Sequence, residues 1–392
     1  MKKVAVLRKG DFYIYAYDLI VELAAHDMEI TAIVSIDKSE ENPIYNDLIK
    51  RTHSLVKLNR LYDWPKRLYF RLKSILNKFR LSTDNLIVSP YLINKTRRKF
   101  KNESFDCIIA IGQESFYWAY KSFKELRHKI IYYNLEVIYK DHPMAISDPT
   151  WSRIVSFEQK TLSRIAGLII QDPFRADVLL NGIMDFDKNR IIYFPVCINE
   201  PLILSKGDYL FKKFGISSNT FVILYFGGIW PGRFLEDLLN QSDILEENMK
   251  MVIHGGRGSY TLKSDKPNII ISTEKLLFSE VTNLISSAHI GLAFYPKNNF
   301  NDMYTAYSSE KISRYCQCGI PFIAFENKNY VYFKSKYDCC ILIQEMDQLS
   351  AAIKEIKSNY TYFKNNAYHA FKEEFDFKKK MARIVDFIDV NC

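Results

Sequence analysis

The feature that most limits the fold is an alternation of short apolar runs with segments of helical spacing, which occurs in both halves of the chain. The first half opens with KKVAVLR, a helix-patterned segment (YIYAYDLIVELAAH) and EITAIVSI. This strand–helix–strand order predicts a parallel sheet with right-handed crossovers. Further strands are expected at 106–112, 129–136 and 166–172. The first turn, RKGDFYIY, lacks the G-x-G-x-x-G spacing of dinucleotide-binding proteins, which disfavours such a cofactor there.

The second half repeats the pattern after a linker bracketed by Pro195 and Pro201. Buried-type strands are predicted at 220–229, 249–258, 268–273, 288–296 and 321–327. Helices are predicted at 233–242, 309–318, 347–360, 362–375 and 376–390. A chain of 392 residues is long enough for two domains of ordinary size. The predicted fold class is therefore α/β, with two doubly wound Rossmann-like domains that face a cleft. In such folds a ligand binds outside the carboxyl ends of the strands.

Positive charge is concentrated in one part of the first half. Between Arg51 and Lys101 there are 14 Lys or Arg residues against Asp63 and Asp84, whereas the whole chain has a net charge of +9. Within it, WPKRLYFRLKSILNKFRL has the spacing of an amphipathic helix. Three interpretations remain open: a surface helix packed on the sheet, a helix lying on an anionic membrane surface via 64–101, or a nucleic-acid site. No recognised nucleic-acid motif accompanies the charge, so a nucleic-acid partner is not expected.

The cysteines, the apolar runs and the N-terminus disfavour a zinc-binding, a membrane-spanning or a secreted protein. The chain has seven cysteines, and Cys316/Cys318 and Cys339/Cys340 lack the Cys-x-x-Cys spacing of a zinc site. We therefore expect buried packing thiols and no metal. No run reaches the roughly 18 apolar residues of a membrane span. The apolar run VAVL is too short for a signal peptide. The expected location is the cytoplasm, with the inner face of the cell membrane as an alternative.

Glycines and cations follow the predicted strands of the second half. FGGIWPGR places Gly227 and Gly228 at a strand end, with Arg233 opening the next helix, and IHGGRG is a second glycine-rich strand end. Glycines let a ligand approach the backbone closely. YSSEKISRY supplies Lys311 at another helix start. Arg233 and Lys311 are therefore expected to converge on a diphosphate from two sides.

The segments LYFGGIWPGRFLEDLL, VIHGGRG, SSAHIGLAFYP and SSEKISRYCQCGIPFIAF resemble, in this order, the second domain of GT-B glycosyltransferases. The resemblance is to the retaining family 4 (group 1) in particular and spans about 220–326. YYNLEVIY and LSRIAGLIIQDPFRADVL in the first half resemble family members more loosely. The resemblance implies an N-terminal acceptor-side domain over 1–198 and a C-terminal nucleotide-sugar-binding domain over 199–375. A last helix, 376–392, is then expected to pack back on the first domain.

The resemblance also implies roles for individual residues. Arg233 and Lys311 are the expected catalytic pair on the donor's diphosphate, and the region 298–309 lines the donor sugar. The other expected donor-binding residues are Gly227, Gly228, His254, Gly255, Ser272, Thr273, Glu310 and Gly319. Three features depart from the family pattern. Arg314 stands where the family has a Glu that contacts the ribose, Gly228 or Ile229 stands in place of an Arg, and Asp302 and Glu310 keep the acidic spacing in another frame.

The function implied is transfer of a sugar from a nucleotide-sugar donor to a glycan or lipid-linked glycan acceptor, in cell-surface polysaccharide synthesis. A retaining, metal-independent mechanism is expected, without a cofactor, because Arg233 and Lys311 replace a metal and the second half of the chain has no Asp-x-Asp. Asn134 and Glu136 are expected on the acceptor side. An inverting enzyme would need a base, for which His26, Asp141 and His142 are candidates. The alternatives are a non-catalytic nucleotide-sugar or membrane-surface binding protein and a GT-B nucleotide-sugar epimerase.

Overall fold

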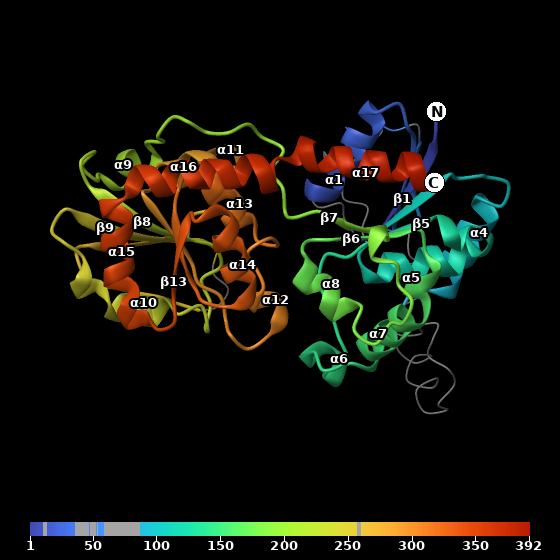
Figure 1. Cartoon of the computed structure of the whole chain (residues 1–392), viewed down its shortest axis with the longest axis horizontal. Helices are drawn as coiled ribbons and strands as arrows, with labels where there is room; N and C mark the ends of the chain where they lie inside the picture. The colour runs from blue at the N-terminus through green and yellow to red at the C-terminus, as the bar shows by residue number, and fades with distance from the viewer. Residues whose placement is uncertain (11–13, 36–46, 48–51, 53, 59–86, 257–259) are drawn as a thin grey trace, which may run out of the picture. The chain divides into compact units, whose positions relative to one another are not determined.

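The computed structural model describes residues 1–10, 14–35, 47, 52, 54–58, 87–256 and 260–392. The chain divides into two compact units (Figure 1). The first consists of Met1–Phe194 together with Met381–Cys392, and the second of Pro195–Lys380. Each unit is a parallel sheet with helices on its faces, so the predicted α/β class with two doubly wound domains is confirmed.

The first unit contains a seven-stranded sheet with the order β3-β2-β1-β4-β5-β6-β7. All of its strand pairs are parallel, and the order reverses between β1 and β4. The strands are β1 (Lys3–Lys9), β2 (Glu29–Ser35), β3 (Ser54–Lys57), β4 (Cys107–Ile111), β5 (Ile130–Tyr133), β6 (Gly167–Ile170) and β7 (Ile191–Tyr193). The helices are α1 (Ile14–Ala25), α4 (Pro90–Lys99), α5 (Gln113–Ser122), α6 (Pro143–Ser147), α7 (Pro149–Thr161) and α8 (Pro173–Leu179).

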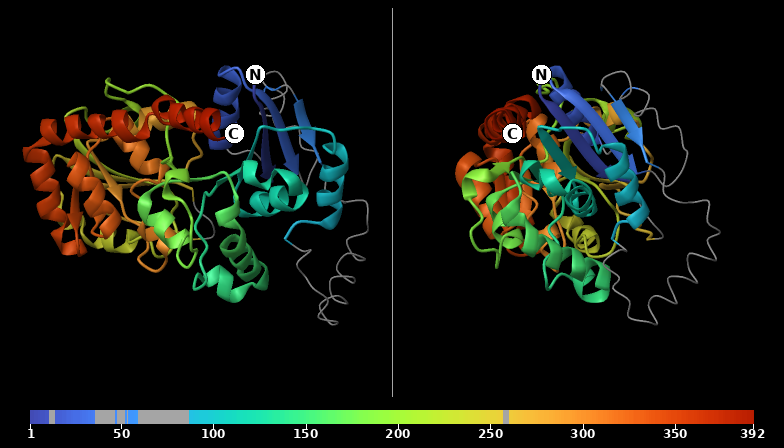
Figure 2. Two further views of the ribbon diagram at one scale, coloured as in Figure 1. Left: turned by 45° about the vertical axis from the view of Figure 1, so that its right-hand side comes forward. Right: turned by 90° about the vertical axis from the view of Figure 1, so that its right-hand side faces the viewer.

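The end of helix α17 (Phe377–Asn391) belongs to the first unit, where it lies beside the N-terminus (Figure 2). The Lys2 ammonium donates to the carbonyl of Ile388 at 2.7 Å and to that of Asp389 at 2.8 Å. The Phe387 ring packs so closely on Gly167 that a Cβ there would lie 2.7 Å from it. Residues 381–392 are therefore part of the packing of this unit.

The second unit contains a six-stranded parallel sheet with the order β10-β9-β8-β11-β12-β13. Its strands are β8 (Phe221–Phe226), β9 (Met249–His254), β10 (Ile269–Ser272), β11 (Ile290–Ala293), β12 (Phe322–Phe325) and β13 (Cys340–Ile343). Its helices are α9 (Tyr209–Phe214), α10 (Leu235–Asn240), α11 (Phe278–Ser286), α12 (Phe300–Met303), α13 (Glu310–Gln317), α14 (Lys328–Tyr337), α15 (Leu349–Ser358) and α16 (Tyr360–Ala370), then a π-helix (Phe371–Phe375). The order reverses between β8 and β11, where doubly wound folds bind ligands.

Both faces of this second sheet are buried, which explains why its strands read as continuous apolar runs. Val222 and Leu224 of β8 face one core with helices α11, α13 and α14. Ile223 and Tyr225, which alternate with them, face the other core with α10 and α15. The period of two along β8 thus divides one apolar run between two layers of helices.

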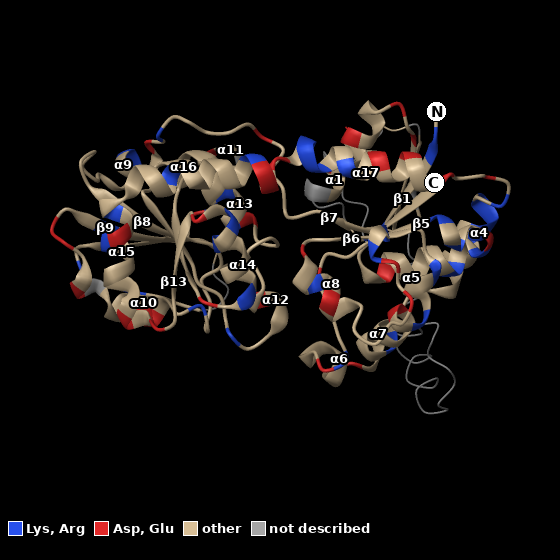
Figure 3. Ribbon diagram, viewed as in Figure 1, with Lys and Arg blue, Asp and Glu red and all other residues tan. Residues whose placement is uncertain are grey.

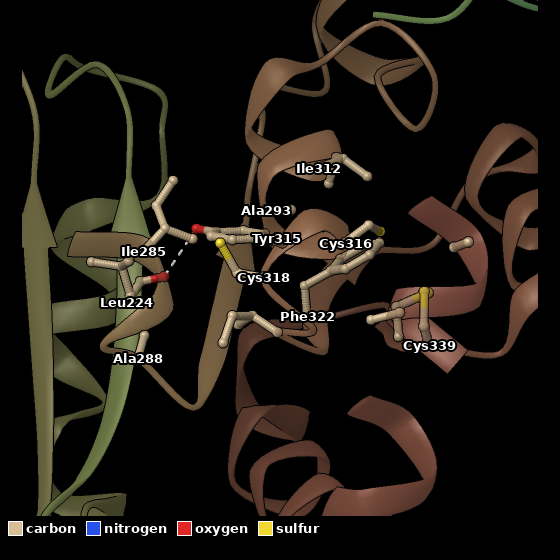
Figure 4. Packing of buried hydrophobic residues seen from close by; sticks show 14 of the residues in the cluster. Leu224, Ile285, Ala288, Ala293, Ile312, Tyr315, Cys316, Cys318, Phe322 and Cys339 are labelled. Carbon is tan, nitrogen blue, oxygen red and sulfur yellow. Dashed lines mark hydrogen bonds between the residues drawn. The ribbon is translucent and has the colours of Figure 1, made fainter. Parts of the chain in front are cut away.

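The cysteines near Gly319 are core residues. Cys316, Cys318 and Cys339 lie in the cluster between the sheet and α13 (Figure 4). Their sulfurs are free thiols, and burial raises the pKa of Cys318 to about 12. A thiol that stays protonated in an apolar core behaves as a small apolar side chain. Here the cysteines help to seat α13 on β12.

Several elements differ from the sequence-based expectation. The helix expected from Arg233 begins at Leu235, because Gly232 (φ 82°) and Phe234 (φ 59°) have left-handed backbone conformations that interrupt it. Strand β13 and helices α11 and α14 were not predicted. Within the described part of the chain, no helix is long and apolar enough to cross a membrane. Of the basic stretch, 64–86 lies outside the described residues, whereas α4 is described and carries Lys and Arg side chains (Figure 3).

Candidate functional site

The glycine-rich strand ends of β8 and β9 contact each other directly. Gly227 has φ 142°, a conformation that favours glycine, and its N–H donates to the carbonyl of His254 at 3.0 Å. The N–H of Gly255 donates to the carbonyl of Ser272 at 3.0 Å. A Cβ on Gly255 would overlap the carbonyl oxygen of Gly227. Both glycines are therefore required for the backbone to turn here, at the carboxyl end of the sheet.

Helix α13 carries Lys311 to this edge of the sheet. The buried Tyr315 hydroxyl donates to the carbonyls of Leu224 at 3.1 Å and Leu292 at 3.3 Å, which ties the helix to β8 and β11 (Figure 4). At its end, Gly319 has φ 63°, and the N–H groups of Gly319 and Ile320 bond the carbonyls of Cys316 and Tyr315. This is the Schellman motif that glycine favours. The Gly-Ile-Pro turn thus ends α13 and fixes its position.

The structure brings Arg233 and Lys311 together around one aromatic ring. The Lys311 ammonium lies 4.8 Å from the centre of the Tyr295 ring, and the Arg233 guanidinium lies 5.0 Å from it. The Lys311 ammonium also lies 4.1 Å from the ring centre of Tyr225. A Cβ on Gly227 would stand 3.2 Å from the Lys311 Nζ atom. The two cations therefore converge beside the glycine turn of β8, as the sequence predicts.

The two cations differ in their partners. Arg233 forms an ion pair with Asp302 of α12, with 3.3 Å between Nη2 and Oδ1. Lys311 is only 7% exposed and, among the described residues, has neither a carboxylate partner nor a hydrogen bond from its ammonium. Burial, and then the nearby charge of Arg233, hold the pKa of Lys311 well below its usual value. An anion placed here would relieve both effects, because an unpaired buried cation is costly.

The other residues expected around the donor lie at the same edge, with different exposures. His254 ends β9 and is 2% exposed, and burial lowers its pKa, which favours the neutral imidazole. Its ring is parallel to that of Phe226, with 6.1 Å between the centres. Ser272 is buried at the end of β10, whereas Thr273 is exposed. Gly228 accepts a hydrogen bond from the Tyr225 hydroxyl at 3.0 Å.

Arg314, which departs from the family pattern, points into the fold. It is 2% exposed, and its guanidinium contacts Glu200 at 3.0 Å, Thr282 at 3.2 Å and Glu310 at 3.3 Å. Arg314 therefore joins α13 and α11 to the chain after Pro195. The resemblance assigns a ribose contact to this position, but the structure gives it an internal ion pair. Glu310 is half exposed and also contacts Arg314, so its carboxylate is held at the first turn of α13.

A small cavity of about 100 Å³ lies beside Asp302, the ion-pair partner of Arg233. It is formed at the ends of β11 and β12 and is lined by Tyr295, Lys297, Asp302, Glu326 and Asn327, together with apolar side chains. The carboxylate of Asp302 therefore borders both the cavity and the guanidinium. The region 298–309, expected to line a donor sugar, contributes to this cavity through α12.

The expected acceptor-side residues have different positions in the first unit. Asn134 is fully buried, and its amide donates to the Tyr132 hydroxyl at 2.8 Å, which donates to Glu158 at 2.6 Å. Glu136 reaches the surface and lies 3.4 Å from the Arg175 guanidinium. Of the pair, the structure therefore leaves only the Glu136 side chain open to an acceptor. Asn134 belongs to an internal hydrogen-bonded chain.

The candidate bases differ in their surroundings. His26 and Asp141 are exposed, and His26 lies 3.5 Å from Glu22 on the same helix. His142 caps α6, where its Nδ1 atom accepts a hydrogen bond from the N–H of Met144 at 3.2 Å. Burial lowers the pKa of His142. The cap explains the presence of a histidine at this position without a catalytic role.

We predict that Glu158 makes the stability of the first unit depend on pH. Burial raises its pKa from the ordinary 4.5 to about 8. Between these values the folded chain holds a proton that the unfolded chain has lost. Its contribution is therefore full below about pH 4.5 and falls as the pH rises towards 8, by roughly 1.4 kcal/mol per unit. Chemical unfolding of wild type and Glu158→Gln at pH 5, 6.5 and 8 measures this.

Glutamine keeps the acceptor for Tyr132 but cannot ionise, so the stability of Glu158→Gln relative to wild type should rise with pH. The control is Glu125→Gln, at an exposed glutamate of the same unit. A difference between Glu158→Gln and wild type that stays constant from pH 5 to 8 would contradict the prediction.

Known structures show the same fold. The chain superimposes on Anabaena HepE, solved in complex with UDP, with a TM-score of 0.68, 13% identity and 100% of both chains covered. A sucrose-phosphate synthase from Thermosynechococcus elongatus gives a TM-score of 0.66 and 11% identity over 100% of this chain and 99% of that one. A candidate UDP-N-acetylglucosamine 2-epimerase from Listeria monocytogenes gives 0.58 and 12%, with 99% and 96% covered. These matches establish the GT-B fold.

The sequence comparisons do not identify a particular family within this fold. No protein-family model matches the chain. No curated protein matches it either. The fold is therefore established by structure, and the particular family named by the sequence resemblance stays a prediction.

Proposed function

We propose that this protein is a glycosyltransferase that uses a nucleotide-sugar donor and binds the donor's diphosphate between Arg233 and Lys311. The observation that carries the proposal is the arrangement of these two cations. They converge on Tyr295 at the strand ends where doubly wound folds bind ligands, and Lys311 is buried without a carboxylate partner among the described residues. The GT-B neighbours support it, since HepE is also solved with UDP-glucose.

The chemistry follows from charge. When the sugar departs, negative charge develops on the diphosphate, and two fixed cations stabilise that charge without reorganising. In this proposal Arg233 and Lys311 supply the stabilisation of the departing diphosphate without a metal. We propose a retaining reaction, in which a leaving phosphate oxygen accepts the proton of the acceptor hydroxyl. This requires no protein base, in keeping with the local partners of His26 and His142.

The donor's sugar and acceptor are proposed by class. We place the sugar towards the cavity beside Asp302, whose carboxylate can accept hydrogen bonds from sugar hydroxyls. The acceptor is a glycan or lipid-linked glycan of the cell surface, and the Glu136 carboxylate in the first unit is the group we expect to meet its hydroxyls. A glycosyltransferase, a nucleotide-sugar epimerase and a non-catalytic nucleotide-sugar binding protein could each use such a site, so activity must be measured.

The experiment is a screen of nucleotides and nucleotide sugars by thermal shift and calorimetry, followed by incubation of the best donor with lipid-linked glycan acceptors. Sugar transfer that needs the acceptor supports the proposal. A free sugar with inverted C2, formed without acceptor, would identify an epimerase. Binding without any turnover would identify a binding protein. Absence of binding by all nucleotides would overturn the donor site.

We also propose that the protein works at an anionic membrane surface in the cytoplasm. The described part of the basic stretch is α4 and the turn after it, where Arg98, Lys99 and Lys101 are exposed and the Tyr91 ring is 43% exposed. Cations with an interfacial aromatic residue are typical of surfaces that bind anionic lipid. A lipid-linked acceptor would be met at such a surface.

Neutralising this α4 surface should weaken vesicle binding. The variant Arg98→Gln/Lys99→Gln/Lys101→Gln removes three charges, each worth about 1 kcal/mol near an anionic membrane, so partitioning should fall by roughly a hundredfold. Co-sedimentation with phosphatidylglycerol vesicles measures it. The matched control removes the exposed Lys263, Lys275 and Lys354 of the second unit. Equal losses in the two triple variants would contradict a specific surface.

A further inference from the structure

We propose that Tyr225 and Tyr295 form a cage that holds the Lys311 ammonium by its ring faces, in place of the carboxylate that usually orients a buried lysine. Both tyrosines are positioning residues, since they act through Lys311. The inference deepens the proposed function by naming the residues that position Lys311. It rests on that function in one respect, which is that the ligand of the ammonium is a diphosphate.

The geometry of the cage comes from two strand ends. Tyr225 lies in β8 and Tyr295 two residues after β11, so the rings stand on the two strands between which the sheet order reverses. Their centres lie 4.1 and 4.8 Å from the Lys311 ammonium, within the roughly 6 Å over which a cation is attracted to an aromatic face. Tyr225 is fully buried, so its ring faces the ammonium without water between them.

Each ring is held by packing and also bonds a segment of the site through its hydroxyl. The Tyr225 hydroxyl donates to the carbonyl of Gly228 at 3.0 Å, which ties the ring to the glycine turn. The Tyr295 hydroxyl bonds the hydroxyl of Ser309, the residue before α13. The rings are therefore held from the same two segments that form the diphosphate site, the turn after β8 and the start of α13.

The consequence is a lysine that is oriented but not neutralised. A carboxylate would orient Lys311 and also cancel its charge, and a diphosphate would then have to displace it. The ring faces attract the ammonium weakly, so they leave its charge available to an incoming dianion. Arg233, which is paired with Asp302, lacks this property. Lys311 is thus the cation that gains an anionic partner only when the ligand binds.

The first test does not need a nucleotide. In protein labelled with [13C]lysine, the Lys311 ε-methylene signal is identified by its loss in Lys311→Arg. Ring currents should place it upfield of the other lysine signals. It should stay there in Tyr225→Phe, which keeps the ring, and move downfield in Tyr225→Leu. A Lys311 signal among those of the other lysines in wild type would overturn the cage, whatever the protein binds.

The second test uses inorganic pyrophosphate as the probe, measured by calorimetry. Tyr225→Leu should weaken its binding about fivefold, whereas Tyr225→Phe should bind as wild type does. In a Lys311→Met background, Tyr225→Leu should change affinity less than twofold, because the ring acts through the ammonium. The same fivefold loss in both backgrounds would show that Tyr225 acts independently and would overturn the proposal. If wild type does not bind pyrophosphate, the diphosphate site fails, and the ring-current test still decides the cage.

Discussion

Replacing Lys311 by methionine is expected to weaken nucleotide-diphosphate binding strongly and at the same time to stabilise the second unit. Lys311 is 7% exposed, and its pKa is lowered by burial and by Arg233. A methionine of similar length removes this desolvated cation and should raise the free energy of unfolding by about 1 kcal/mol. Loss of a charged contact of about 2–3 kcal/mol to phosphate should weaken nucleotide binding roughly a hundredfold. Calorimetry and chemical unfolding measure the two effects.

The control for this change is Lys354→Met, at an exposed lysine of α15 in the same unit. It should leave nucleotide affinity unchanged and should not stabilise. If Lys311→Met bound nucleotide as tightly as wild type, the ammonium would have no role in the donor site. If Lys311→Met were instead strongly destabilised, Lys311 would have a structural partner in the folded chain.

The second large effect is expected from Gly255→Ala. The added methyl group would overlap the carbonyl oxygen of Gly227, which is backbone and cannot rotate away. The ends of β8 and β9 would have to separate, at a cost of about 3 kcal/mol. For a domain of this size the loss corresponds to a fall in Tm of roughly 6–12 °C. Because the glycine turn contacts Lys311, nucleotide binding should be lost as well.

The adjacent residue offers a matched control. A Cβ on Gly256 would meet no atom of the described residues within 4 Å, so Gly256→Ala should keep both the Tm and the nucleotide affinity of wild type. Differential scanning calorimetry of the two variants separates the close approach at Gly255 from a general effect of alanine in this loop. Equal Tm values for the two variants would show that the strand ends can move apart freely.

Most strands of the two sheets, though not β3 and β13, could be predicted from the sequence because they are buried on both faces. FVILYF and FIAF have no polar interruption, and glycines follow the first of these runs. The convergence of Arg233 and Lys311 could also be predicted, since the order of elements in a parallel sheet brings successive strand ends to one edge. Each of these inferences depends on a local pattern that is repeated along the chain.

The environment of the site could not be predicted in the same way. Tyr225 and Tyr295 read as apolar residues at strand ends, and only the packing of α13 on the sheet shows that their rings face Lys311. Asn134 has the sequence position of a surface amide, yet the orientation of Tyr132 and Glu158 places it inside a polar chain. Contacts of this kind depend on side-chain directions between distant elements, which no spacing rule specifies.

The assignment of residues 381–392 to the first unit has a consequence for the order in which the chain folds as it is synthesised. Met381, Ile384 and Ile388 are fully buried there, and Ile388 accepts a hydrogen bond from Lys2. The second unit, in contrast, is continuous from Pro195 to Lys380. During translation the second unit therefore has all of its residues before the first can complete its packing, although the first begins the chain. The first unit therefore cannot complete its packing until residues 381–392 have been synthesised.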